Sequence, residues 1–164
     1  MLAVQDTTFL NYNAHPATEN LGSIASTADG AIGLVLHDTL AFNLERTPLG
    51  LLDIQCWARD PNDFGKKHRR NELPIEEKES HKWLVSYRAV AAAQKHCPAT
   101  MFVSVGDREA DIYELFHEAL SDSTGPKLLV RAEHDRVLAD GQGHLWDRVK
   151  AQSLSGLQEV QVPR

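Results

Sequence analysis

Apolar residues are concentrated in two stretches near the start of the chain, and the types of residue in them predict strands. β-Branched and aromatic residues dominate positions 2–12, and the run 31–59 reads as two further strands. These two are expected to be joined near "ERTPLG", where Pro48 and Gly50 supply a turn. Because the connection is short, the three strands are expected to form an antiparallel meander.

A helical period replaces this strand-like pattern after residue 74. Pro74 is expected to open a helix over 75–97, since proline is tolerated in the first turn. The apolar residues of this helix recur every three or four positions, at Trp83, Leu84, Tyr87, Val90 and Ala91. Such a stripe is typical of a helix that packs on a sheet.

The later part of the chain returns twice to strand patterns. The apolar run 100–106 predicts a strand covered on both faces, 112–120 has a helical period, and 127–134 predicts another strand. The resulting order is three strands, helix, strand, helix, strand. That order predicts an α/β fold with a mixed sheet and parallel crossovers.

Composition indicates one soluble globular domain. The chain has 164 residues, of which 42% are apolar and 24% charged. No run approaches the roughly 20 apolar residues of a membrane span, and no secretory signal is seen, so a cytoplasmic setting is expected. Cys56 and Cys97 are expected to be buried free thiols. The net charge of −6 speaks against tight nucleic-acid binding.

Acidic residues cluster where the strand 100–106 ends, in "VGDREAD". Asp107 directly follows that strand, at a sheet edge where ligands gather in open α/β folds. Asp6 lies in the first strand. If the two strands are neighbours, about 4.8 Å apart, both carboxylates can bind the same divalent cations. The plainer interpretations are a strand-end carboxylate for Asp6 and a helix cap for Asp107.

Five strings together carry a specific resemblance: "VQDTTFLNY", "LGSIASTADG", "LGLLDIQCWARDP", "EEKESHKWL" and "VSVGDREADIYELF". Over Val4 to His134 the chain resembles bacterial cut-and-paste DDE transposases of the insertion-sequence-four type. The resemblance implies an RNase H-like mixed sheet of three antiparallel and then two parallel strands with flanking helices. It also implies that Asp6 and Asp107 are the first two carboxylates of a metal-binding catalytic triad.

The same resemblance implies a chemistry and partners. Mg²⁺ or Mn²⁺ would support phosphodiester cleavage at transposon ends, followed by strand transfer into target DNA. The partners would be transposon ends and target duplex, with a homodimer on DNA, no membrane, and a location at the bacterial nucleoid in the cytoplasm.

Other residues are expected around the two aspartates. Thr7 and Asp111 would support the metal ligands, although Asp111 could equally pair with Arg108 or Arg131. The residues expected to contact DNA phosphates are Lys78, Lys82, Arg108 and Arg131. The basic run 66–70 reads as a solvated loop, with DNA backbone contacts as the alternative.

The third carboxylate of this family lies in a Tyr-x2-Arg-x3-Glu-x6-Lys helix, and this chain contains no such pattern. Residues 1–134 are therefore expected to be a partial catalytic core, and 135–164 the truncated start of a β-rich insertion. Glu159 lies in a strand-like segment and is a poor substitute. Two alternatives stay open: a non-catalytic relic or DNA-binding fragment, and a stand-alone metal-dependent nuclease that uses Glu109 or Asp111.

Overall fold

The computed structural model describes residues 1–25, 30–60, 73–141, 143–157 and 159. The chain divides into two compact units, Met1–Arg131 and Ala132–Arg164. The division lies close to the boundary after residue 134 that the sequence predicted. Each unit is described by itself.

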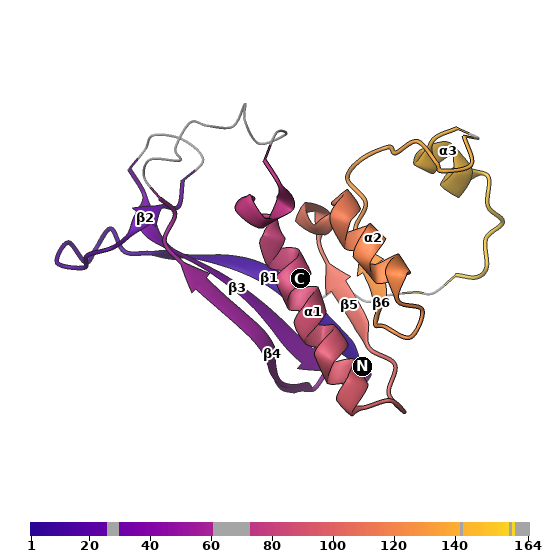
Figure 1. Ribbon diagram of the computed structural model, residues 1–164, viewed down its shortest axis with the longest axis horizontal. Coiled ribbons are helices and arrows are strands. Elements are labelled where there is room, and N and C mark those ends of the chain that lie inside the picture. The colour runs from indigo at the N-terminus through magenta and orange to yellow at the C-terminus, as the bar shows by residue number, and fades with distance from the viewer. Residues whose placement is uncertain (26–29, 61–72, 142, 158, 160–164) are drawn as a thin grey trace. The chain divides into compact units, whose positions relative to one another are not determined.

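A six-stranded mixed sheet forms the centre of the first unit (Figure 1). The strand order is β2-β3-β1-β5-β6, and β4 also pairs with β3. β1 is antiparallel to β3 but parallel to β5, and β5 is parallel to β6. The strands are β1 (Leu2–Asn11), β2 (Gly22–Ser23), β3 (Ile32–Phe42), β4 (Pro48–Trp57), β5 (Val103–Gly106) and β6 (Lys127–Val130).

This arrangement confirms the predicted α/β class and mixed sheet with flanking helices. β1, β3 and β4 form the antiparallel part, and β5 and β6 extend it in parallel, which is compatible with an RNase H-like fold. The short strand β2 was not predicted, because two residues carry no readable alternation.

The turn between β3 and β4 lies earlier than predicted. Asn43 and Thr47 close it through hydrogen bonds, and Arg46 within it has a φ of 67°. Pro48 and Gly50 instead begin β4, where the register against β3 shifts. A proline is tolerated as the first residue of a strand because no ladder hydrogen bond is lost there.

The first long helix, α1 (His81–His96), begins later than predicted. A separate 3-10 helix, η3 (Ile75–Glu77), follows Pro74 and ends at Lys78, whose backbone is extended. Glu79, ahead of α1, binds the guanidinium of Arg59 at the end of β4 through two hydrogen bonds of 2.7 and 2.8 Å. This tertiary contact outweighs the helical pattern of the sequence.

The predicted stripe of α1 is largely confirmed. Trp83, Leu84, Tyr87 and Val90 are buried, whereas Ala91 is half-buried. The second helix, α2 (Tyr113–Ser121), adds the buried Leu115 to the same apolar core.

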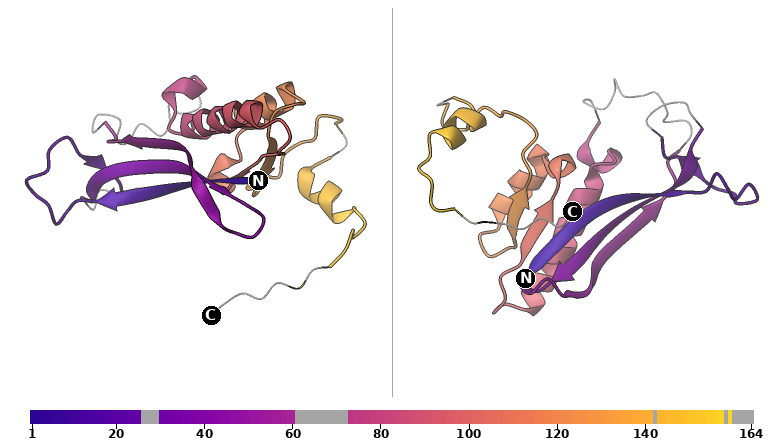
Figure 2. Two further views of the ribbon diagram at one scale, coloured as in Figure 1. Left: turned by 90° about the horizontal axis from the view of Figure 1, so that it is seen from below. Right: turned by 180° about the vertical axis from the view of Figure 1, so that it is seen from behind.

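Both helices cover one face of the sheet (Figure 2). In the first unit, the opposite face carries aliphatic side chains that stay open to solvent, among them Leu51, Ile54 and Leu129. Alternation along β4 places Ile54 on this open face, because its neighbours Asp53 and Gln55 bond to Ser86 of α1.

The second unit contains a short helix, α3 (Leu145–Lys150), and an isolated β-bridge between Val137 and His144. Its expected identity as the start of a β-rich insertion stays a prediction, since most of the strand-like segment at its end lies outside the described residues. In the part of the chain that the structure describes, no helix combines the length and apolarity needed to cross a membrane. Cys56 and Cys97 are free but exposed, so the prediction of buried thiols was wrong.

Candidate metal site

Asp6 and Asp107 leave neighbouring parallel strands at the same level of the sheet. Val4 of β1 pairs with Val105 of β5, and each aspartate follows its paired valine by two positions. β5 has ended at Gly106, so Asp107 stands at the carboxyl end of its strand while Asp6 lies within β1. Both are exposed. The sheet register therefore brings together two acids that are far apart in the sequence.

A small open cavity of about 40 Å³ lies where these strands diverge. It has room for about one water molecule, whose share of liquid volume is about 30 Å³, or for one small ion. The residues that line it come from β1, from α1 and from the segment after β5: Asp6, Thr7, Phe9, Trp83, Asp107 and Glu109. Both predicted catalytic aspartates thus border a single cavity.

Local structure fixes Asp107 at this edge. Its side chain caps a 3-10 helix, η4 (Arg108–Ala110), by accepting a hydrogen bond of 2.8 Å from the backbone N–H of Glu109. The predicted capping role is therefore confirmed. Capping uses one carboxylate oxygen, Oδ1, so Oδ2 is not committed to the cap.

Four alternating charges run toward the cavity. Arg59 binds Glu79, whose carboxylate lies 3.8 Å from the ammonium of Lys82. Lys82 in turn lies 3.4 Å from the carboxylate of Glu109. The Lys82 side chain is only 5% exposed, so a DNA phosphate would have to compete with both glutamates for it. Contact between Lys82 and a DNA phosphate therefore stays a prediction, and it would cost the free energy of breaking the two ion pairs.

Asp38 is an acid near this site that sequence reasoning missed. It is the direct cross-strand partner of Asp6, so both side chains point to the same face of the sheet, away from α1. Burial raises the pKa of the Asp38 carboxyl, and the nearby charge of Asp6 raises it further. Only the strand register, which alternation alone does not give, could have revealed this pair.

His37 lies on the other face of the same strand, beneath α1. Its ring is fully buried and packs edge to face against Trp83, with ring centroids 4.6 Å apart. Burial lowers the pKa of His37 from 6.5 to about 4, and the charge of Lys82 contributes to the shift. The imidazole is therefore neutral at physiological pH.

The remaining predicted residues that the structure describes differ in exposure, and none of them lines the cavity. Arg108 and Arg131 are exposed, and the backbone N–H of Arg131 bonds to the Gly106 carbonyl at 3.2 Å, next to Asp107. Lys78 is half-buried at the end of η3, and Asp111 is buried and does not line the cavity. The basic run 66–70 lies outside the described residues.

The oxygen donors at this cavity are of the type that a hard cation prefers, but there are few of them. Carboxylate and hydroxyl oxygens are the ligands that Mg²⁺ and Mn²⁺ prefer, and Mg²⁺ commonly takes only one or two protein carboxylates, with water and phosphate completing its shell. Asp6 and Asp107 meet that minimum. Among the described residues, no group of three or more acidic, histidine or cysteine side chains is arranged to hold a metal ion.

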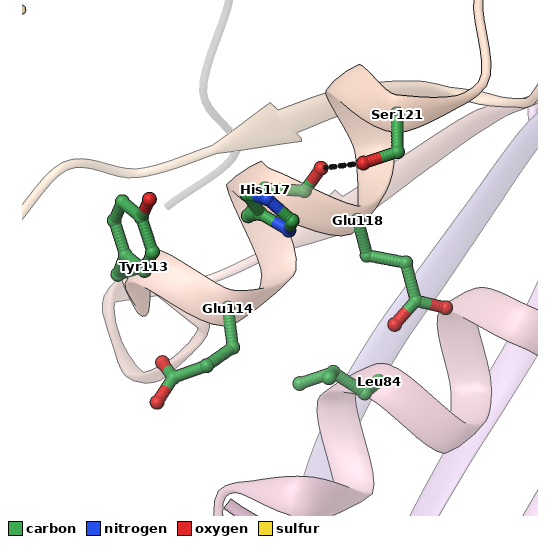
Figure 3. A pocket seen from close by; sticks show the side chains of 6 residues that line it. All are labelled: Leu84, Tyr113, Glu114, His117, Glu118 and Ser121. Carbon is green, nitrogen blue, oxygen red and sulfur yellow. Dashed lines mark hydrogen bonds between the residues drawn. The ribbon is translucent and has the colours of Figure 1, made fainter.

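A larger hollow of about 320 Å³ lies between α1 and α2 (Figure 3). Figure 3 shows Tyr113, Glu114 and His117 along α2, with Leu84 on the neighbouring helix. Glu118, also in its lining, already binds Arg88 at 2.7 Å. The hollow contains neither Asp6 nor Asp107, so its size does not make it the stronger candidate.

A comparison with protein-family models adds nothing to this description, because no family model matches the chain.

Proposed function

We propose that the chain is the catalytic-core region of a bacterial DDE transposase that cleaves phosphodiester bonds at transposon ends and joins them to target DNA. The observation that carries the proposal is that Asp6 and Asp107 line one cavity at adjacent parallel strands. Their carboxylates have the donor type that two-metal phosphoryl transfer requires. The sequence strings around both acids agree with the same family.

Within this proposal, Asp6 and Asp107 hold the divalent cation, Mg²⁺ or Mn²⁺. A cation bound there supplies positive charge to the transferring phosphate and lowers the pKa of an attacking water or hydroxyl. The exposed guanidiniums of Arg108 and Arg131 lie next to Asp107 in the chain and in the sheet. In this proposal they bind DNA phosphates and fix the register of the duplex.

The third carboxylate is expected in a segment that this sequence does not include. DNA is therefore proposed as the partner of the whole protein, with a homodimer assembled on the transposon ends at the bacterial nucleoid. For the chain by itself, cation binding is the function most directly supported. Because the net charge of the chain is −6, tight binding to duplex DNA would require basic residues from other parts of the whole protein.

The test is Mn²⁺ titration calorimetry on the full chain, with cleavage of a labelled duplex carrying the ends of the parent element. Asp6→Asn and Asp107→Asn should each abolish cation uptake, because each removes a charged ligand. Glu45→Gln, an exposed acid in the β3–β4 turn, is the matched control and should bind as the native chain does. Absence of uptake by the native chain would contradict the proposal. Uptake without cleavage is the result expected of a core that lacks its third carboxylate, and it would leave cation binding as the function of this chain.

A second candidate is a metal-dependent nuclease complete within this chain. The observation in its favour is that Glu109 lines the same cavity as the two aspartates. Its ion pair with Lys82 weighs against a ligand role. If Glu109→Gln abolishes a Mn²⁺-dependent cleavage that the native chain shows, this candidate replaces the first.

A further inference from the structure

Thr7 and His37 form a hydrogen-bonded pair across β1 and β3. Thr7 Oγ1 lies 2.9 Å from His37 Nδ1, and the two residues are direct partners in the antiparallel register. Thr7 follows Asp6 in the chain and lines the same cavity. Because successive side chains of a strand point to opposite faces, fixing Thr7 under α1 also fixes the direction in which Asp6 leaves β1.

The environment of His37 connects this pair to the second aspartate. His37 packs edge to face on Trp83, at an interplanar angle of 74°. Trp83 also lines the cavity, and its ring lies so close to Gly106 that a Cβ there would come within 3.2 Å. Gly106 directly precedes Asp107. One buried imidazole thus contacts Thr7, which follows Asp6, and Trp83, whose ring lies close to the glycine ahead of Asp107.

Packing alone does not explain an imidazole at this position. His37 is fully buried, and in the described part of the chain its Nε2 has no hydrogen-bond partner, which costs free energy that an apolar ring would not. What the imidazole adds is the hydrogen bond to Thr7. This bond acts on the segment that carries Asp6.

We propose that His37 is a positioning residue that orients Thr7, and through it the Asp6 carboxylate, beside Asp107. The cation that Asp6 would bind rests on the proposed function, whereas the orientation of Asp6 does not. Residues that orient metal ligands from behind typically change metal affinity by about 10- to 100-fold when they are lost.

The test uses the full chain and two measurements. Thr7→Val removes the hydroxyl but keeps the branched shape, and His37→Phe keeps the ring but removes the hydrogen bond. Thr7→Ser should restore most of what the valine loses, and Thr47→Val, in the exposed β3–β4 turn, is the matched control for deletion of a hydroxyl. The first measurement is the carbon-13 NMR signal of the Asp6 carboxyl without metal. The second is Mn²⁺ affinity by calorimetry.

Thr7→Val and His37→Phe should shift the Asp6 carboxyl signal and weaken Mn²⁺ binding about 10-fold, and Thr47→Val should change neither. An unshifted Asp6 signal in a folded Thr7→Val chain would overturn the inference, whatever the metal does. If the native chain takes up no Mn²⁺ but the Asp6 signal shifts, the positioning role stands and the proposed function fails. Should His37→Phe not fold, the smaller change in Thr7→Val still decides the outcome.

Discussion

At the scale of residues, Asp6 of β1 and Asp38 of β3 lie directly opposite each other, and their carboxylates repel each other. Asp38 has a raised pKa because it is partly buried and because Asp6 is its cross-strand partner. Like charges directly opposite each other in a sheet destabilise it. Asp38→Asn should therefore raise the free energy of unfolding at pH 7 by about 0.2–1 kcal/mol.

The sign of this effect depends on pH. The folded-state pKa of Asp38 lies above the unfolded value of 3.8, so the folded chain takes up the proton first as the pH falls. The advantage of Asp38→Asn should shrink through that range and vanish once Asp38 is protonated in both states. Urea unfolding at pH 7 and pH 3.5 measures it. An equal gain at both pH values would show that charge is not the cause.

His37 gives a second pH dependence, of opposite direction. Its folded-state pKa of about 4 lies below the unfolded value of 6.5, so unfolded chains bind the proton first as the pH falls. The contribution to stability is complete above about pH 6.5 and is lost progressively toward pH 4, by up to about 3 kcal/mol. His37→Phe should flatten this part of the stability profile, measured by urea unfolding between pH 7.5 and pH 4.5. The exposed His15→Gln should leave the slope unchanged.

The residues of the candidate site differ in whether the sequence could predict them. Asp6 and Asp107 were predicted because each lies in a short string with a recognisable pattern. Asp38 and His37 were not, because their importance depends on which residue of β1 lies opposite each of them. Register is set by long-range packing and turn geometry, so local alternation could not give it.

At the scale of elements, α1 packs on the end of β5 through a glycine. A Cβ on Gly106 would lie 2.6 Å from the Cβ of Ala110 and 3.2 Å from the ring of Trp83. Gly106→Ala should therefore push η4 or α1 away from the sheet and destabilise the chain by about 1–3 kcal/mol. Thermal unfolding followed by circular dichroism measures this loss, and Gly156→Ala, with nothing within 4 Å of the added methyl, is the control. Equal melting temperatures would show that the contact is not tight.

Element types were more predictable from the sequence than element ends. Long runs rich in β-branched and aromatic residues identified β1, β3 and β4. The helical period identified α1 and α2, because it reflects which face of a helix is buried. The start of α1 was misplaced because Glu79 bonds to Arg59, a partner far away in the sequence. The β3–β4 turn was misplaced because Arg46, a residue without a turn preference, adopts the left-handed conformation.

For the whole molecule, the two compact units predict separable folding. Residues 1–131 contain the sheet, α1, α2 and the buried cores, so this fragment should fold without the remainder. Its unfolding free energy should lie within about 1 kcal/mol of that of the full chain, because few of the described core residues are lost. Circular dichroism and urea titration of both chains measure the difference. A fragment that stays unfolded would show that the second unit completes the core.

Under the proposed function, the contact at Gly106 bears on how the site would change once selection for cleavage ended. Loss of the acid at position 107 removes one capping hydrogen bond, at a cost of about 0.5–2 kcal/mol, whereas a side chain at position 106 collides with both Ala110 and Trp83. Inactive descendants of such a gene should therefore keep the glycine long after the adjacent aspartate has drifted. A lineage in which the two disappear together would indicate instead that the fold itself was being abandoned.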